Sequence, residues 1–123
     1  LGSRYPDGKI INWPLKRRIF SRFANILCRL LISLKFHDYT NGYRFYNRKA
    51  ASHLAQSKIL HTGYINLSET IAKLLKHQFT IASFPIVFEN RKRGKSNTDL
   101  KEMLGSFFAI FQIAARYWFD KQF

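Results

Sequence analysis

Apolar and polar positions along this chain repeat with a helical period in three stretches. The longest covers residues 14–34 and predicts a helix with one apolar face, formed by Leu15, Ile19, Phe23, Ile26, Leu27, Leu30 and Leu34. Pro14 suits the first turn of a helix, because the N–H that proline lacks would have no partner there. A second stripe of this helix is polar and contains no acid: Arg18, Arg22, Asn25 and Arg29. Unrelieved positive charge favours an anionic partner over an ordinary solvated face.

The remaining pattern predicts one loop, two short helices, two strands and a final helix. Residues 1–13 indicate a loop, Asn47 is expected to cap a helix over 48–56, and another helix is predicted over 66–76. Residues 44–46 are compatible with a short strand. Residues 79–89 form the clearest strand, and their continuous apolar character predicts burial on both faces. Pro85 within it indicates an edge or a bulge.

The last predicted helix, over about 99–119, is apolar around most of its circumference. Its polar positions fall on one narrow stripe: Lys101, Gly105, Gln112 and Arg116. Such a helix is either buried in a protein core or lies in a lipid interface. The pattern alone leaves both interpretations open, although its uncharged run over 103–115 is too short to span a bilayer.

Charge is the extreme feature of the composition. The 123 residues amount to one domain at most, and a 46% apolar share argues against a disordered chain. A net charge of +14 implies an anionic partner, which could be nucleic acid, an anionic membrane surface or a phosphorylated ligand. The single cysteine, Cys28, and four scattered histidines show no metal-ligand spacing and are interpreted as structural or surface residues.

A basic loop follows the predicted strand. Residues 90–96 contain a glycine and four cations, a combination that can hold phosphate. Basic runs are common, however, and this stretch taken alone favours a solvated basic turn. Glu69 also has two interpretations. It lies three residues after Asn66 and could complete a helix capping box, or it could be a functional carboxylate, and the spacing favours the cap.

Several phrases stand in a recognisable order along the chain. Gly2-Ser3-Arg4-Tyr5 is followed by the Trp13-Pro14 helix start, by Asp38-Tyr39-Thr40-Asn41-Gly42-Tyr43-Arg44, by Gly63-Tyr64 with Glu69, and by the strand and basic loop ending at Ser96. Together they resemble the C-terminal half of family 2 glycosyltransferases. The dolichol- or polyprenyl-phosphate mannosyltransferases are the most similar group, and the resemblance covers residues 1 to about 100.

The resemblance implies an α/β architecture, the C-terminal portion of a GT-A fold over 1–98, followed by an amphipathic helix over 99–123 that could lie on a membrane. It implies transfer of mannose or glucose from a nucleotide sugar to a polyprenyl or dolichyl phosphate, at the cytoplasmic face of a membrane. It also implies a divalent metal, Mg²⁺ or Mn²⁺, whose ligands would lie in an N-terminal half outside this chain. We therefore expect the 123 residues alone to be inactive.

Site residues carry over from the matching phrases. The resemblance assigns Arg4, Arg17 and Ser21 to the acceptor phosphate, and Arg91, Arg93, Lys95 and Ser96 to the donor diphosphate. Secondary candidates are Asp38, Thr40, Arg44 and Glu69. The loop over 5–9 lacks the longer glycine run that is frequent in mannosyltransferases, which leaves the sugar and the lipid open.

The two basic clusters suit this chemistry. A lipid phosphate oxygen attacks the anomeric carbon of the sugar, so the protein must bring two anions together and stabilise the leaving diphosphate. Two alternatives remain: a family 2 transferase with another acceptor, and a non-enzymatic basic module for nucleic acid. The absence of a nucleic-acid-binding motif and the helical spacing of the apolar residues argue against the second, so no nucleic-acid partner is expected.

Overall fold

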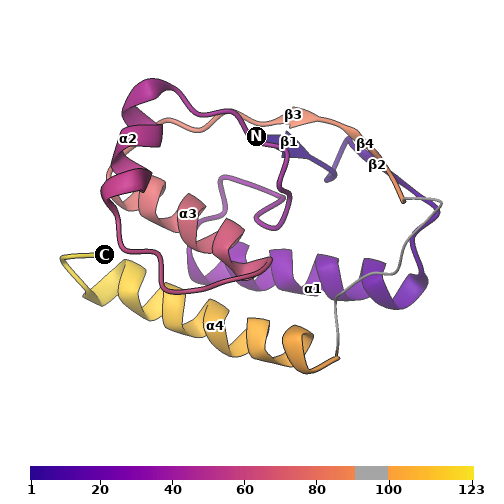
Figure 1. Ribbon diagram of the computed structural model, residues 1–123. Coiled ribbons are helices and arrows are strands. Elements are labelled where there is room, and N and C mark those ends of the chain that lie inside the picture. The colour runs from indigo at the N-terminus through magenta and orange to yellow at the C-terminus, as the bar shows by residue number, and fades with distance from the viewer. Residues whose placement is uncertain (91–99) are drawn as a thin grey trace.

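The computed structural model describes the backbone of residues 1–90 and 100–123 and the side chains of 1–90 and 104–123. Three helices form one layer of the described part: α1 (Leu15–Leu31), α3 (Ile65–Lys76) and α4 (Leu100–Phe119). Helix α4 packs against both α1 and α3, and α2 (Arg48–Gln56) packs against α3. Four short strands run along the opposite side of the molecule, and the connection between α1 and α2 passes between them and the helices (Figure 1). The described chain therefore has the mixed α/β character that the sequence predicts.

The helices begin and end close to the predicted residues. Asn47 caps α2, and its side chain accepts a 2.8 Å hydrogen bond from the Ala50 N–H, as predicted. Helix α3 begins one residue before the predicted start. Helix α1 ends at Leu31 instead of continuing to Leu34. The chain turns away there, and the Tyr39 hydroxyl donates to the Ser33 carbonyl at 2.6 Å, which fixes the turn that follows.

The strands differ from the prediction. Residues 79–89 contain only β3 (Phe84–Pro85) and β4 (Val87–Glu89), interrupted at Ile86, and residues 44–46 form no strand. Their partners lie in the predicted loop: β1 (Gly2–Ser3) pairs in parallel with β3, and β2 (Lys9–Ile11) with β4. The prediction of burial on both faces was wrong, because each described sheet has two strands and leaves Phe84 and Val87 exposed.

The hydrophobic core lies between the three layered helices and the segment that follows α1. It buries Cys28 of α1, Ile71 of α3 and both Ile110 and Ile113 of α4. The face of α1 that packs inward carries Ser21, Ala24, Asn25 and Cys28. Most of the apolar stripe predicted from the spacing is exposed instead, including Leu15, Ile19, Phe23, Ile26 and Leu30. Asn25, placed by its spacing in the cationic stripe, is buried.

Helix α4 contributes to the core and also exposes large apolar side chains. Ala109, Ile110 and Ile113 are buried, whereas Phe108, Phe111, Trp118 and Phe119 are exposed. Within the described ranges 1–90 and 100–123, no helix combines the length and apolarity that crossing a bilayer requires. The interpretation as a core helix is thus correct for one face of α4, and lipid contact of its exposed face stays a prediction.

Candidate functional site

A cavity of about 80 Å³ opens between the first turns of α1, the segment after β1 and the first half of α4. The three predicted acceptor residues and the secondary candidate Thr40 reach it, together with residues of α3, α4 and the loop before α3. Its lining consists of Arg4, Trp13, Arg17, Phe20, Ser21, Ala24, Thr40, Tyr64, Ile65, Ser106 and Ile110. Both arginines come from the side of β1 and α1, and the α3 and α4 side is more apolar, so the cavity has two chemically different walls.

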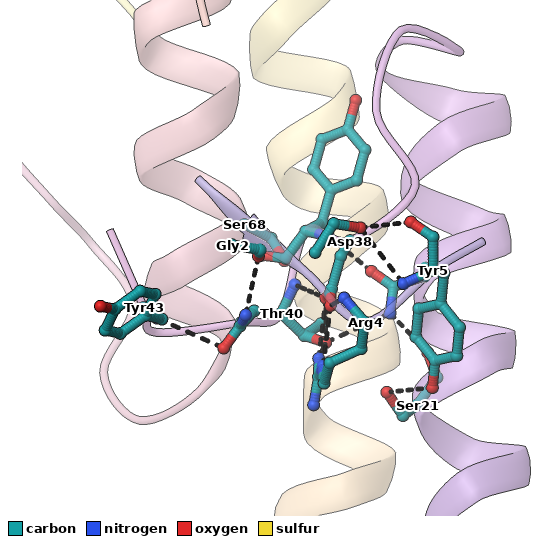
Figure 2. A network of polar contacts seen from close by, with 12 residues as sticks. Gly2, Arg4, Tyr5, Ser21, Asp38, Thr40, Tyr43 and Ser68 are labelled. Atoms are coloured by element: carbon teal, nitrogen blue, oxygen red, sulfur yellow. Dashed lines mark hydrogen bonds and ion pairs between the residues drawn. The ribbon is translucent and has the colours of Figure 1, made fainter. Parts of the chain in front are cut away.

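Arg4 and Asp38 form a buried ion pair beside this cavity (Figure 2). The Arg4 Nε donates to Asp38 Oδ2 and its Nη2 to Oδ1, both at 2.7 Å, and the Arg4 backbone N–H donates to Oδ2 at 2.9 Å. Arg4 Nη2 also donates to Thr40 Oγ1 at 2.8 Å. Asp38 is fully buried and Arg4 is 5% exposed. These hydrogen bonds engage Nε and Nη2 and fix the plane of the guanidinium at the cavity wall.

The backbone around Arg4 is held from two sides. Gly2 donates its N–H to the Tyr43 carbonyl at 2.9 Å and accepts from the Asn41 side chain at 2.7 Å, which ties β1 to the segment carrying Asp38. On the other side the turn over 5–8 returns to Arg4. A Cβ on Gly8 would lie 2.7 Å from the Arg4 Cα and collide with the Ser3 carbonyl oxygen. Glycine at position 8 therefore allows this close approach.

Arg17 and Ser21 lie one turn apart on α1, as their spacing predicts. The Arg17 guanidinium lies over the ring of Trp13, with Cζ 4.2 Å from the ring centroid, and Nη1 donates to Asn90 Oδ1 at 3.3 Å. Ser21 is buried and accepts a hydrogen bond from the Tyr5 hydroxyl at 3.3 Å (Figure 2). The structure thus brings Arg4, Arg17 and Ser21 to one cavity, and the Asp38 carboxylate neutralises the first of them.

Asn25 joins this polar network from the next turn of α1. Its side-chain oxygen accepts the Tyr39 N–H at 2.6 Å, and its amide nitrogen donates to Thr40 Oγ1 at 3.2 Å. Thr40 in turn accepts from Arg4. The network connects α1, the Asp38 segment and the chain after β1, and it fixes the Thr40 hydroxyl at the cavity wall.

Arg44, a secondary candidate, has its polar groups engaged by the protein itself. It donates to the carbonyls of Asn41, Leu67 and Tyr39 and to Thr70 Oγ1, at 2.7–2.8 Å. Burial lowers the pKa of this guanidinium, an effect that nearby Tyr46 and Asp38 oppose. Arg44 does not line the first cavity but a second one of about 430 Å³, beside α2 and α3. Arg44 therefore links the segment of Tyr39 and Asn41 to helix α3.

The favoured interpretation of Glu69 as a helix cap was wrong. Helix α3 begins at Ile65 without a side-chain cap, and Glu69 lies a full turn inside it. Its buried carboxylate accepts the backbone N–H groups of Leu60 and His61, at 2.9–3.1 Å, and contacts His61 Nδ1 at 2.9 Å. Burial disfavours the charged carboxylate, but these hydrogen bonds outweigh it and hold the pKa of Glu69 below its usual value.

The predicted donor-phosphate residues Arg91, Arg93, Lys95 and Ser96 lie outside the described residues. The described residues also contain no group of three or more His, Cys, Asp or Glu side chains placed to hold a metal ion. Asp38 and Glu69 are engaged by Arg4 and by the His61 segment, so these carboxylates do not fit an additional cation. Ligands for a divalent metal would have to come from residues other than these two.

Several residues of the cavity wall were assigned to no site from the sequence. Trp13 marks only a helix start in the pattern, and Phe20, Tyr64 and Ile110 belong to no predicted site. A signal for Trp13 was present, since an aromatic residue four positions before Arg17 places a ring within reach of that cation. No comparable signal exists for Ile110, because its approach to the cavity depends on how α4 packs.

Comparison with known proteins identifies the relatives of this chain. A polyprenol monophosphomannose synthase of Mycolicibacterium smegmatis is 30% identical over 122 residues, which cover 98% of the chain and 46% of that protein. This chain is a relative of polyprenyl-phosphate mannosyltransferases. An undecaprenyl-phosphate mannosyltransferase of Micrococcus luteus is 32% identical over 100 residues, covering 78% of the chain and 40% of the relative.

The chain spans less than half the length of these two mannosyltransferases. No family model matches it, and no solved structure gives a significant match. The resemblance seen in the sequence phrases is thereby confirmed, and it extends over nearly the whole chain. The mannosyltransferase relatives are enzymes by name, and their names specify polyprenyl lipids as acceptors.

Proposed function

We propose that this chain is part of a mannosyltransferase that moves mannose from a nucleotide sugar to a polyprenyl phosphate. The names of the two relatives described above denote mannosyl transfer involving a polyprenyl phosphate, and the first of them aligns with 98% of the chain, the span in which the cavity lies. The proposal includes a GT-A fold of family 2, of which the described helices and parallel strands would be the C-terminal portion.

One observation carries the proposal. The cavity gathers Arg4, Arg17 and Ser21, the residues that the resemblance assigns to the acceptor phosphate, from two separate segments of the chain. An anionic phosphate placed there would receive charge-assisted hydrogen bonds from the Arg17 guanidinium and a hydrogen bond from the Ser21 hydroxyl. Apolar residues on the opposite wall, such as Ile65 and Ile110, would face the first part of the lipid tail.

The roles of the two arginines differ in this site. Arg4 is paired with the fully buried Asp38, so its charge is neutralised and its main contribution is a guanidinium fixed at the cavity wall. Arg17 is held over the Trp13 ring and supplies positive charge to the phosphate. Because the Arg4–Asp38 pair is neutral, Arg17 would supply most of the positive charge at the site. The phosphate would then be positioned without being bound so tightly that transfer is slowed.

In the proposed reaction a phosphate oxygen of the lipid forms a bond to the anomeric carbon of mannose. The bond between that carbon and the nucleoside diphosphate breaks, and the diphosphate leaves with the electron pair. The lipid phosphate is already anionic, so no side chain must remove a proton. The described residues orient this nucleophile, and a divalent cation held outside this chain, Mg²⁺ or Mn²⁺, would offset diphosphate charge.

We further propose that the enzyme works on the surface of a membrane, at its cytoplasmic face. Exposed apolar side chains run along one side of α1: Leu15, Ile19, Phe23, Ile26 and Leu30. Exposed cations adjoin them on the same helix, at Lys16 and Arg22. An apolar stripe bordered by positive charge is typical of helices that lie in the interface of an anionic bilayer.

Replacement of Arg17 tests the function. Arg17→Ala in the full-length protein should raise the acceptor KM, because a charged hydrogen bond contributes about 1.5–3 kcal/mol, roughly 10- to 100-fold. Arg48→Ala is the matched control, since it removes the same side chain and charge from an exposed position of α2 that does not line the cavity. Initial rates of labelled mannose transfer to polyprenyl phosphate give both constants. An unchanged acceptor KM and rate in Arg17→Ala would overturn the proposed acceptor site.

A further inference from the structure

The indole ring of Trp13 occupies the junction between β2 and α1, where it lines the cavity. The side chain is buried, at 8% exposure, and its ring meets the ring of Phe88 edge-on at a centroid distance of 5.4 Å. Pro14 follows it and starts α1. These contacts hold the ring in one position, so its polar atom has a fixed place as well.

Two guanidinium groups lie over this ring. Arg17 Cζ is 4.2 Å from the ring centroid and Arg4 Cζ is 5.1 Å from it. A ring face attracts cations, and the attraction is strongest when both partners are sheltered from water. Trp13 therefore orders the cation of Arg17 at the cavity.

The Nε1–H of Trp13 is a buried donor without a hydrogen-bond partner in the described part of the chain. Buried indole N–H groups usually find an acceptor, because an unmet donor loses its hydrogen bond to water. Four other buried side-chain nitrogens lack a hydrogen-bond partner there: Arg18 Nε, Arg29 Nε, His53 Nε2 and Arg116 Nη1. Trp13 is the residue of these five that lines the cavity.

We propose that Trp13 is a direct phosphate ligand, donating its Nε1–H to an anionic oxygen bound in the cavity while its ring face positions Arg17. This inference rests on the proposed function, and it adds a residue to the acceptor site that the sequence phrases did not assign. A phosphate oxygen supplies the acceptor that the indole lacks. The same ring thus provides one hydrogen bond of its own and positions the donor of a second, charged one.

Nuclear magnetic resonance of the indole group tests the hydrogen bond directly. The full-length protein, labelled with ¹⁵N, is titrated with farnesyl phosphate, a short soluble polyprenyl phosphate, and in a second arm with inorganic phosphate. Trp13→Phe identifies the Trp13 resonance by its loss. The Trp118 resonance is an internal control, because its Nε1–H already donates to the Leu31 carbonyl at 2.7 Å, away from the cavity.

The proposal expects a downfield shift of the Trp13 indole proton with farnesyl phosphate and little change for Trp118. Saturation at much lower concentration with farnesyl phosphate than with inorganic phosphate would identify the lipid headgroup as the ligand; equal affinities would assign the site to free phosphate and overturn the acceptor assignment. Binding that depends on Arg17 but leaves the Trp13 proton unshifted would overturn the role of Trp13 and leave the proposed function standing. Absence of any Arg17-dependent binding would overturn both.

Kinetics separate the N–H group from the ring. Trp13→Phe should raise the acceptor KM about 10- to 100-fold and leave the donor KM unchanged. Replacement of Trp13 by benzothienylalanine, which keeps the shape and aromatic face but exchanges N–H for sulfur, covers the case in which phenylalanine packs poorly. The same acceptor-specific loss in this variant would assign the effect to the N–H. A wild-type acceptor KM in it would overturn the hydrogen bond.

Discussion

Replacement of Asp38 should destabilise the protein far more than the loss of one surface charge. Asp38 accepts three hydrogen bonds from Arg4, at 2.7, 2.7 and 2.9 Å, and is itself fully buried. In Asp38→Asn the guanidinium keeps its positive charge but faces an amide, which can accept at only one of the two positions. Removing one member of a buried ion pair costs about 3–5 kcal/mol, because the other charge stays buried and unpaired.

That loss is a large part of a typical unfolding free energy, which is about 5–15 kcal/mol. Urea denaturation of the full-length protein, followed by circular dichroism, measures it as a fall in the midpoint concentration. Asp7→Asn is the matched control, since Asp7 is exposed in the neighbouring turn and the charge change is the same. Its effect should stay within about 0.5 kcal/mol.

A double variant distinguishes the pair from a general packing defect. Arg4→Met combined with Asp38→Leu removes both charges, so it should cost less than the sum of the two single changes. A loss below about 1 kcal/mol for Asp38→Asn is the size found for exposed ion pairs. That result would refute the view that the Arg4–Asp38 contact organises this side of the cavity.

Three further predictions concern other groups. Glu69→Gln should lower the free energy of unfolding by about 1–3 kcal/mol at pH 7. The lowered pKa of Glu69 in the folded protein stabilises the fold only above the pKa of the unfolded chain, about 4.3, so thermal melts should show the difference between variant and wild type shrinking as pH falls below that value. A constant difference from pH 7 to pH 3 would contradict this prediction. Burial raises the pKa of the Cys28 thiol to about 12, and its hydrogen bond to Ser68 opposes this shift only weakly. Because the thiol is buried and protonated, iodoacetamide should label it only after unfolding, which mass spectrometry would detect. Rapid labelling of the native protein would be the contrary outcome. Trp118 is 64% exposed, so its fluorescence emission should shift to the blue when phosphatidylglycerol vesicles are added. Comparison with Trp118→Phe isolates the signal of this residue. An unchanged emission maximum would argue against contact of α4 with lipid.

The helices were predictable because their signals are local. Asn47 caps α2 through a hydrogen bond to Ala50, three residues away, and the period of apolar positions in α1 and α3 spans several turns. The strands were not predictable in the same way. Strand β1 has two residues, too few to show alternation, and its partner β3 lies about eighty residues along the chain.

The direction that α1 faces was also beyond the sequence. The sequence predicts one apolar face for this helix, yet the buried side carries Ser21, Asn25 and Cys28 together with Ala24. Polar side chains face inward there because the backbone of the following segment needs partners, as Asn25 shows by accepting the Tyr39 N–H. The periodicity of a helix identifies its faces, but hydrogen-bond demand from a distant segment decided which of them was buried.

The site was predictable through resemblance more than through spacing. Arg17 and Ser21 are one turn apart and could be paired from the sequence, whereas the contact of Arg4 with Asp38 joins residues 34 positions apart. Nothing in the composition distinguishes Arg4, engaged by a carboxylate, from Arg17, which lies over an indole. The charges along the chain thus indicated an anion site but not the different surroundings of the cations that form it.

Helix α1 places Ser21 and Asn25 on one side and Ile19 and Phe23 on the other, so the two surfaces are separated by one helix diameter, about 10–12 Å. If the outer side rests on lipid, the phosphate of a membrane-bound polyprenol is already within about one headgroup layer of the reaction centre. Only the first isoprene units would have to leave the bilayer. The quantity that sets the rate would then be the two-dimensional density of acceptor in the membrane. Diluting the acceptor with inert phospholipid at constant bulk concentration would slow turnover.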